Sequence, residues 1–579
     1  MTSENIQKTA RKNIQKTARK YALQNAVQFE GSAQLKAVIG KVIAVFQKKG
    51  IHPKEIIPLV KKTVDDVNGL SKDQQRDELE TLAPELLIKE KKVRDFSLSD
   101  LPFAEDKKVI TRFPPEPNGY LHIGHAKAAI IDYEYAKKYD GSFILRFDDT
   151  NPEKDCVEFY DAQKQDLKWL GIKWDKSYHT SDNLKMHYEL CLQLLKQSDA
   201  YVCLCDAENI KMGRQKKKNC PCRNLPSEIH VDQWEQLLSS TLDNGIVRLK
   251  ADMKSLNTAM RDPTLFRIIT TPHPLQKDRF HIWPTYDFAG AVEDSISGVT
   301  HPFRTKEYEL RDEVYFYLLD KLGLRKPHLM EFARLSIEGM PVSKRKITPL
   351  IENGSVSGYD DVRLPTLRGL KKRGIVPKAI KKFVFSQGIS KVESIVSFGL
   401  VEAENRKIID PVSKRLFFVS DPVELIVSGI QKKSIVMPFH PTDKSLGTRS
   451  VLIDDSFYVP REDIASLNVG DTFRLKDLCN VKIQKKNDKI YGMYAGEELI
   501  AKSKKIQWTS KDALSIDVFK PEVLFKNDTF NENSLQVIHG NVEPAIKKLK
   551  DGEIVQFERF GFVRIEKEND VIKGFFTHR

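Results

Sequence analysis

The spacing of apolar side chains predicts three regions of different structure along the chain. From residue 21 to residue 91, apolar residues recur every three or four positions, which indicates amphipathic helices that each bury one face. From about residue 411, short alternating apolar segments separated by turn residues predict β-barrels. The clearest of these segments are 416–419, 434–437, 473–475 and 555–557. Between the two regions, strand-like apolar runs precede helical patterns, as in an α/β domain.

The segment that starts at residue 109 predicts the first part of a nucleotide-binding unit. An apolar run at 109–113 is typical of a buried strand, and the prolines, Asn118 and Gly119 that follow it break regular structure. A helical pattern then begins at Leu121, so that phosphates are expected at a helix N-terminus. His122 and His125 lie on its first turn, and the commoner Gly-x-x-x-x-Gly-Lys-Ser/Thr loop occurs nowhere in the sequence.

A second apolar run, residues 142–147, ends in the carboxylates Asp148 and Asp149. In nucleotide-binding folds, a carboxylate about 20 residues further on holds a ribose hydroxyl, and Asp148 stands 23 residues after His125. A carboxylate in a cleft needs a cationic or hydrogen-bond-donating partner. The alternative is an acidic strand end that caps the helix starting near Glu153.

Four of the seven cysteines lie close together in the sequence, at Cys203, Cys205, Cys220 and Cys222. Two close pairs of thiolates suit a tetrahedral zinc ion, although Cys-x-Cys is tighter than the commoner Cys-x-x-Cys. This spacing fits a reducing compartment and a metal site better than disulfides. We expect a structural zinc that braces a small insertion.

Composition adds a preference for a polyanionic partner. Lys and Arg number 94 against 80 Asp and Glu, which gives a net charge of +14 and a pI of about 9.1. No run of 18 apolar residues predicts a membrane span. Residues 1–20 are basic and poor in acidic side chains, as in a transit peptide, but they lack the apolar core of a secretion signal. We expect a cytoplasmic protein.

The first twenty residues contain a perfect duplication, because the octapeptide at 5–12 recurs at 13–20. A period of eight residues is too short for a solenoid repeat. We interpret the duplication as a local insertion that lengthens a helix.

The fifteen residues from Thr111 to His125 resemble the His-Ile-Gly-His signature of class I aminoacyl-tRNA synthetases. The fuller form, Pro-Pro-Glu-Pro-Asn-Gly-Tyr-Leu-His-Ile-Gly-His-Ala-Lys, is similar to the glutamyl/glutaminyl branch in its archaeal and eukaryotic versions. A second segment, 339–346, resembles the Lys-Met-Ser-Lys-Ser loop that closes over ATP. It departs from that motif, since Pro341 and Val342 stand where Lys and Met would, and Arg345 replaces the final Ser.

The resemblance implies roles for two sets of residues. His122, His125 and Lys344 would act on the phosphates, and the full ATP-binding set would be His122, Gly124, His125, Ser343, Lys344 and Arg345. The amino acid would be held by Arg112, Asp148, Tyr286 and Arg304.

Arg304 decides which amino acid is expected. Glutamyl enzymes carry an arginine here that pairs with the substrate's side-chain carboxylate, whereas a neutral residue is expected in glutaminyl enzymes. An arginine fork binds a carboxylate through two bonds and would be left unpaired against an amide. A surface arginine without this role is the alternative.

The resemblance also implies a domain order and a fold class, α/β followed by all-β. An N-terminal helical appended domain would span 1–100. A Rossmann-like catalytic domain would span 101–347, with an acceptor-end insertion and the cysteine-rich element near 200–260. A helical connecting domain rich in Lys and Arg (348–410) and β-barrel anticodon-binding domains (411–579) would follow.

The expected reaction is ATP-dependent activation of L-glutamate and its transfer to the 3′-terminal ribose of glutamate tRNA, with glutamine tRNA as a further candidate substrate. Magnesium would accompany ATP, and a monomer is expected. Three alternatives stay open: a glutaminyl-tRNA synthetase, a non-catalytic tRNA-binding scaffold, and a tRNA-modifying glutamyl transferase. Arg304, the two intact signatures and residues 411–579, respectively, argue against them.

Overall fold

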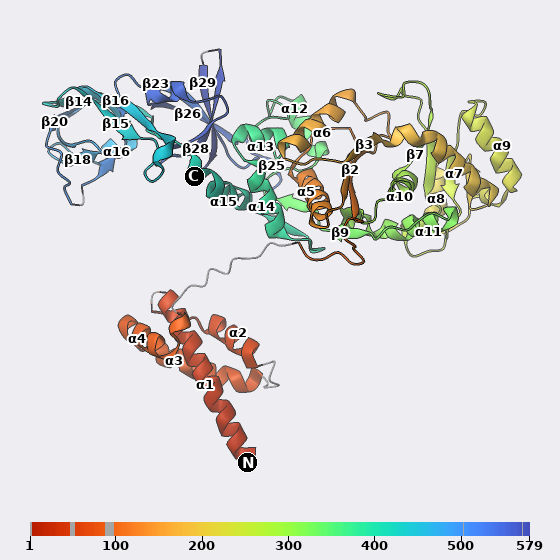
Figure 1. Ribbon diagram of the computed structural model, residues 1–579, viewed down its shortest axis with the longest axis horizontal. Helices are drawn as coiled ribbons and strands as arrows, with labels where there is room; N and C mark the ends of the chain where they lie inside the picture. Colours follow the sequence, from red (N-terminus) through yellow and green to blue (C-terminus); the bar gives the residue numbers. More distant parts are fainter. Residues whose placement is uncertain (1–2, 30, 47–52, 87–97, 502, 570) are drawn as a thin grey trace. The chain divides into compact units, whose positions relative to one another are not determined.

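The computed structural model describes residues 3–29, 31–46, 53–86, 98–501, 503–569 and 571–579 (Figure 1). It divides into two compact units, Met1–Asp95 and Phe96–Arg579. This division lies close to the predicted boundary at residue 100. The predicted helical pattern extends to residue 91, but residues 87–91 lie outside the described residues.

The N-terminal unit is helical, as its apolar spacing predicts. Its core contains buried Leu23, Val38, Val60 and Leu79, one from each helix. Both copies of the duplicated octapeptide lie in the first helix, which confirms that the repeat lengthens a helix. The helices are α1 (Ser3–Gln28), α2 (Leu35–Phe46), α3 (Pro53–Asn68) and α4 (Lys72–Leu82).

The second unit begins with a parallel sheet of three strands in the order β1-β2-β3. The two connections, from β1 to β2 and from β2 to β3, each contain a helix that returns the chain to the same end of the sheet, as parallel pairing requires. The elements are β1 (Ile110–Phe113), α5 (Ile123–Lys138), β2 (Ser142–Phe147), α6 (Val157–Trp169) and β3 (Lys176–His179). Residues of β1, β2, α5 and α6 share one apolar core.

A four-stranded sheet in the order β4-β5-β6-β7 follows, with antiparallel pairing throughout. Its strands are β4 (Ala200–Cys203), β5 (Ile246–Leu249), β6 (Thr264–Ile268) and β7 (Ile282–Pro284), and its helices are α7 (Leu184–Lys196), α8 (Ala207–Gln215) and α9 (Ser227–Leu238). Helices α10 (Tyr286–Ile296) and α11 (Asp312–Leu322) pack on the same core. Between them, β8 (Phe303–Thr305) pairs in parallel with β9 (Met330–Phe332).

A helical segment leads from the nucleotide-binding region to the C-terminal strands. Its helices are α12 (Lys344–Glu352), α13 (Leu367–Arg373), α14 (Pro377–Gln387) and α15 (Gly399–Ile409), and β10 (Leu335–Ile337) pairs with β11 (Ser394–Val396). Arg363, which lies between α12 and α13, donates to Ser534 Oγ at 3.1 Å, so the segment contacts the C-terminal region just before the strand that begins at Leu535.

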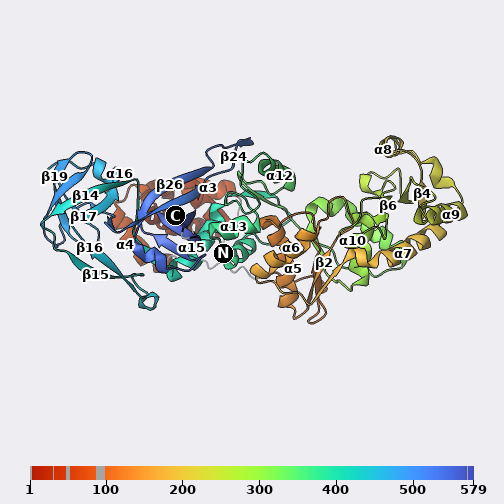
Figure 2. The same ribbon diagram turned by 90° about the horizontal axis from the view of Figure 1, so that it is seen from above.

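Two seven-stranded sheets form the C-terminal region, which confirms the predicted β-rich architecture (Figure 2). One sheet consists of β12 (Arg415–Leu416), β27 (Ile554–Phe557), β28 (Gly561–Glu568), β29 (Val571–His578), β23 (Leu514–Pro521), β26 (Leu535–Val542) and β13 (Phe418–Ser420). The other consists of β21 (Lys505–Ile506), β18 (Thr472–Leu475), β19 (Asn480–Lys486), β20 (Ile490–Tyr494), β14 (Pro422–Ser428), β17 (Ser456–Pro460) and β22 (Thr509–Ser510). Two hairpins accompany them, β15 (Lys433–Pro438) with β16 (Thr448–Ile453) and β24 (Phe525–Lys526) with β25 (Thr529–Phe530).

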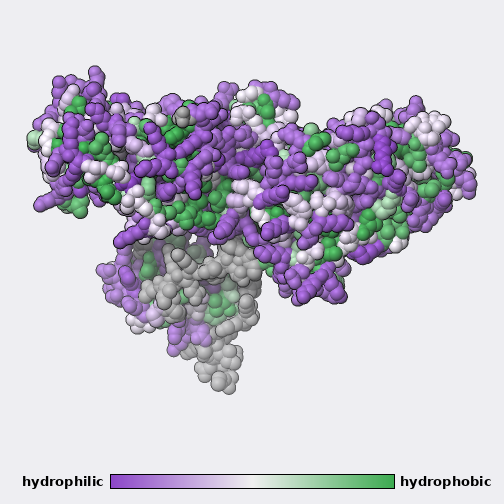
Figure 3. Space-filling model, turned by 45° about the horizontal axis from the view of Figure 1, so that its top comes forward, coloured by the Kyte–Doolittle hydropathy of each residue, from purple (hydrophilic) through white to green (hydrophobic). Residues whose placement is uncertain are grey.

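Hydrophilic side chains cover most of the face drawn in Figure 3, with apolar side chains scattered between them. Among the described residues, no helix is both long enough and apolar enough to cross a lipid bilayer.

Candidate active site

The turn between β1 and α5 is held by the two predicted histidines. His122 is the N-cap residue of α5, and its Nδ1 accepts from the backbone N–H groups of Gly124 at 3.0 Å and His125 at 3.3 Å. The backbone N–H of His122 in turn donates to His125 Nδ1 at 3.3 Å. A Cβ at Gly124 would lie 2.8 Å from His122 Cε1, so the turn requires glycine at this position.

Both histidines are neutral near pH 7. Burial lowers the pKa of His125 to about 4, with the charge of Arg334 as a second cause. Burial also lowers the pKa of His122 well below its usual value, with the neighbouring ring of His125 and the charge of Arg334 as further causes. Because both Nδ1 atoms accept hydrogen bonds, each neutral ring carries its proton on Nε2. The turn therefore offers two neutral N–H donors.

One cavity of about 700 Å³ brings the two predicted nucleotide signatures together. Ser343 is the N-cap residue of α12, and Lys344 begins that helix and donates to the carbonyl oxygen of Asn118 in the first signature. The cavity is as large as typical small-molecule sites. Its polar lining includes Asn118, His122, His125, Lys154, Arg334, Ser343, Lys344 and Arg345. Neutral donors and cations of this kind suit a polyphosphate.

Two of the four residues predicted to hold the amino acid are linked through buried charges. Asp148, at the end of β2, accepts from Arg146 Nε at 2.6 Å and from Thr180 Oγ1 at 3.0 Å. Arg112, in β1, is 4% exposed; its Nε donates to Asp294 at 2.9 Å and its Nη1 to the Phe303 carbonyl at 2.7 Å. Arg112 thus faces the protein interior, with part of its donor capacity already used.

The other two predicted residues come from α10 and β8. Tyr286 is the first residue of α10, is partly exposed, and packs against Tyr308 with ring centres 4.8 Å apart. Arg304 is 6% exposed, forms an ion pair with Asp312 and lies over the ring of Tyr315 at 5.3 Å. Its Nε is buried and has no hydrogen-bond partner among the described residues. A buried guanidinium with an unused donor is able to take a carboxylate.

Sequence reasoning missed three charged residues of this region: Arg146, Asp294 and Asp312. Arg146 lies in β2 and Asp294 in α10, and both are almost completely buried. For Arg146 and Asp294 the available signal was position, since Arg146 lies within the otherwise apolar run 143–147, and Asp294, together with Glu293, follows the apolar and small residues 288–292. Charged side chains are almost never fully buried unless they are paired, so each required a partner.

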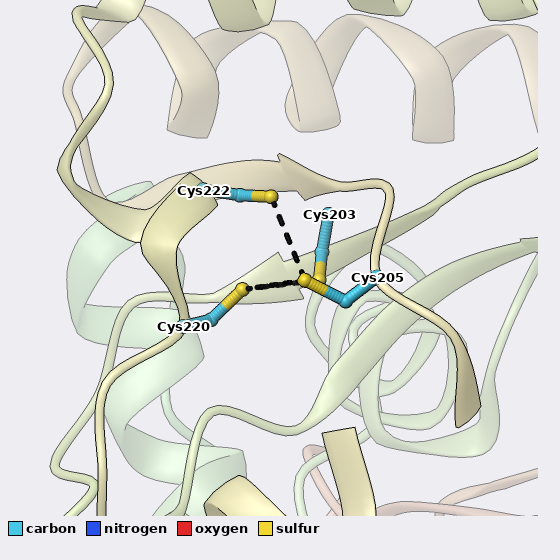
Figure 4. A group of neighbouring side chains, drawn as sticks. All are labelled: Cys203, Cys205, Cys220 and Cys222. Carbon is cyan, nitrogen blue, oxygen red and sulfur yellow. Dashed lines mark hydrogen bonds between the residues drawn. The ribbon is translucent and has the colours of Figure 1, made fainter. Parts of the chain in front are cut away.

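The four predicted metal ligands lie apart from these residues, at the end of β4 and around the short helix Pro221–Asn224 (Figure 4). Cys220 Sγ is 3.4 Å from Cys203 Sγ and 3.3 Å from Cys205 Sγ, and Cys205 Sγ is 3.9 Å from Cys222 Sγ. All four sulfur atoms lie within 4.8 Å of one another. A tetrahedral zinc with Zn–S bonds of about 2.3 Å separates its sulfurs by about 3.8 Å. The cluster could therefore hold a metal ion.

These features define a class of protein. A parallel sheet whose first strand leads through paired histidines into a helix, with a lysine-bearing loop on the same cavity, is the architecture of a class I aminoacyl-tRNA synthetase. The family described as tRNA synthetases class I (E and Q), catalytic domain, matches residues 108–411. Two anti-codon binding domains of the same family match residues 413–496 and 505–566. The chain belongs to this family.

Curated relatives are similar over nearly the whole chain. A glutamate–tRNA ligase from Nitrosopumilus maritimus is 43% identical over 96% of this chain and 98% of its own length. One from Cenarchaeum symbiosum is 42% identical with the same coverage. Among solved structures, a glutamate tRNA ligase from Elizabethkingia meningosepticum in complex with its amino acid covers 53% of this chain and 70% of its own, with 20% identity and a TM-score of 0.41.

Proposed function

We propose that this protein is a ligase that joins L-glutamate to tRNA at the expense of ATP. The observation that carries the proposal is the pairing of two sites in one catalytic region. One is a cavity lined by both nucleotide signatures, and the other contains Arg304, a buried arginine with an unused donor. The names of the full-length relatives support the same activity.

The reaction proceeds in two steps. The α-carboxylate of glutamate attacks the α-phosphorus of ATP, which forms glutamyl-adenylate and releases pyrophosphate. A hydroxyl of the 3′-terminal ribose of tRNA, the 2′-hydroxyl by family resemblance, then attacks the activated carbonyl and releases AMP. Neither step needs a protein nucleophile, so catalysis rests on positioning and on stabilising charge at phosphate.

Residues of the cavity bind ATP. His122 and His125 donate their Nε2–H groups to phosphate oxygens, and Gly124 keeps the turn tight enough for this. Lys344, supported by Ser343 and Arg345, stabilises the negative charge that develops on the departing pyrophosphate. Magnesium, when bound with ATP, adds further charge neutralisation there.

Residues around the buried charges bind the amino acid. Asp148 accepts a hydrogen bond from the α-ammonium group, and Tyr286 lines the pocket. Arg304 pairs with the side-chain carboxylate, while Arg112 contributes positive charge from the protein interior. Glutamine would bring no carboxylate to the guanidinium of Arg304, and this disfavours the alternative of a glutaminyl enzyme. The lining of one cavity by His122, His125 and Lys344 disfavours a non-catalytic scaffold.

The remaining parts serve tRNA in this proposal. Residues 411–579 form the anticodon-binding domains, 348–410 contact the tRNA stem, 101–347 form the catalytic domain, and 1–100 form a helical appended domain. A structural zinc on Cys203, Cys205, Cys220 and Cys222 braces the insertion near residues 200–260 that faces the acceptor end. A cytoplasmic location and a monomeric state stay predictions.

Aminoacylation tests the proposal directly. Transcripts of glutamate tRNA and glutamine tRNA are each incubated with the protein, ATP and labelled glutamate or labelled glutamine. We expect labelled glutamate on glutamate tRNA, and the glutamine transcript shows whether a second tRNA is charged. Charging with glutamine would refute the amino-acid assignment, and no charging under any condition would favour the scaffold.

A further inference from the structure

A single buried carboxylate connects residues that four separate segments bring to the amino-acid site. Asp294 lies on α10 and is 1% exposed. It accepts from Arg112 Nε at 2.9 Å and Nη2 at 3.2 Å, and from Arg146 Nη1 at 2.8 Å. The hydroxyl of Tyr315, on α11, donates to its second oxygen at 3.2 Å.

Each of these partners of Asp294 either belongs to the residues that the proposed function assigns to amino-acid binding or contacts one of them. Arg112 is such a residue itself. Arg146 donates to Asp148 through Nε at 2.6 Å and Nη2 at 3.3 Å. The ring of Tyr315 lies 5.3 Å from the guanidinium of Arg304. Asp294 is therefore connected, directly or through one neighbour, to three of the four assigned residues, Arg112, Asp148 and Arg304. It is not itself one of the assigned residues.

Charge balance explains why a carboxylate is needed at this position. Arg112 and Arg146 bring two positive charges into the interior, where Asp294 pairs with both of them and Asp148 pairs with Arg146. Asp132 is buried nearby, and burial raises the pKa of its carboxyl well above the usual value. Without Asp294, Arg112 would lose its ion-pair partner and Arg146 would keep Asp148 alone, next to the place where an ammonium group is to bind.

We propose that Asp294 is a positioning residue for the amino acid: it holds Arg112 and Arg146 in place and shares their charge, so that Asp148 stays available for the α-ammonium group. This inference rests on the proposed function. It predicts that loss of the Asp294 charge weakens binding of glutamate and leaves binding of ATP unchanged, because the nucleotide cavity is lined by other residues.

The neighbouring residue supplies a matched control. Glu293 is 0% exposed, lies on the same helix and carries the same charge. Its hydrogen bonds, however, go to His187 Nε2 at 2.8 Å and Asn183 Nδ2 at 3.0 Å, neither of which belongs to the assigned site. A role in folding alone would affect Asp294→Asn and Glu293→Gln in the same way.

The experiment measures KM for glutamate and KM for ATP in aminoacylation by the wild-type protein, Asp294→Asn and Glu293→Gln. For Asp294→Asn we expect KM for glutamate to rise about tenfold or more, since a buried guanidinium loses its partner, while KM for ATP stays within about twofold. For Glu293→Gln, any change should be shared by both constants. An unchanged KM for glutamate in Asp294→Asn, or an equal rise in both constants, would overturn the proposal.

If Asp294→Asn does not fold, a less disruptive variant tests the role of Asp294. Tyr315→Phe removes one hydrogen bond to Asp294 and keeps all charges, and we expect a rise of about threefold in KM for glutamate alone. No rise, or an equal rise for ATP, would refute the proposal. The wild-type measurement separates the two claims, because a wild-type protein that charges no glutamate refutes the proposed function, whatever the variants show.

Discussion

The two halves of the catalytic region differ in how their charged side chains are arranged. The nucleotide end is an open cavity of about 700 Å³, lined by neutral histidines and by the cations Lys154, Arg334, Lys344 and Arg345. At the amino-acid end the arginines are buried, and their charges are already matched inside the protein, as Arg112 and Arg146 are by Asp294 and Asp148.

Under the proposed function, this difference follows from what each end has to bind. A polyphosphate arrives with several negative charges and must later depart as pyrophosphate, so exposed cations and neutral donors suit it. An amino acid has to be distinguished from close isosteres, and this requires charges fixed in place before the substrate arrives. The two ends should therefore respond to different substitutions, and four predictions test that separation.

The largest effect is expected at the amino-acid end. Arg304→Ala removes the proposed partner of the side-chain carboxylate, and kcat/KM for glutamate should fall about 10³-fold, because a buried ion pair loses one partner. KM for ATP, measured in the same aminoacylation assay, should change by less than about twofold. An unchanged kcat/KM for glutamate would refute the carboxylate pairing.

Arg304→Lys tests whether the positive charge alone accounts for recognition of the carboxylate. It keeps the positive charge but loses the planar fork and its second hydrogen bond. We expect this variant to lie between the wild-type protein and Arg304→Ala. Equal activity of the lysine and wild-type proteins would mean that charge alone, without the fork, accounts for recognition.

At the nucleotide end, Lys344→Ala should lower kcat about 10²-fold, since a cation that stabilises charge in the transition state is lost. KM for glutamate should stay near the wild-type value. Lys346→Ala is the matched control, because Lys346 lies two residues later on α12, is largely exposed and pairs with Asp528. A comparable loss in both variants would contradict a specific role for Lys344.

A third prediction concerns the charge of the histidine turn. Because the pKa of His125 is lowered to about 4, the ring stays neutral throughout the range from pH 5.5 to pH 8. The ratio of kcat/KM for ATP between the wild-type protein and His125→Asn should therefore be constant over that range. A change in this ratio near pH 6.5, the ordinary pKa of histidine, would show that a cationic ring binds phosphate.

The smallest effect on either substrate is expected from the cysteine cluster. Cys205→Ser should remove bound zinc, which elemental analysis detects as about one ion per chain in the wild-type protein. Both KM for glutamate and KM for ATP should stay within about twofold, because neither end contains these cysteines. Absence of zinc from the wild-type protein would refute the metal assignment, and a selective change in either KM would contradict the separation.

The sequence predicted those parts of the molecule that local pattern controls. Residues 109–113 and 142–147 overlap strands β1 and β2, and the segments at 434–437 and 473–475 lie within β15 and β18. Both nucleotide signatures meet in one cavity, as their resemblance implies. Apolar periodicity and turn residues are local properties, so one sequence is enough to reveal them.

Pairing between distant charges could not be predicted in the same way. Arg112 and Asp294 are 182 positions apart, and Arg146 and Asp294 are 148 positions apart. Their burial indicates that each needs a partner, but only the packing of α10 against the sheet decides which partner it finds. The ion pair of Arg304 with Asp312 was also missed, although these two residues are only eight positions apart.

The central claim is that the buried charges select glutamate while the open cavity binds ATP. Its most direct test is the ratio of kcat/KM for glutamate to kcat/KM for glutamine, measured with the wild-type protein on one glutamate tRNA transcript. A site built to pair a carboxylate should give a ratio of about 10³ or more. A ratio near one, or a preference for glutamine, would contradict the account.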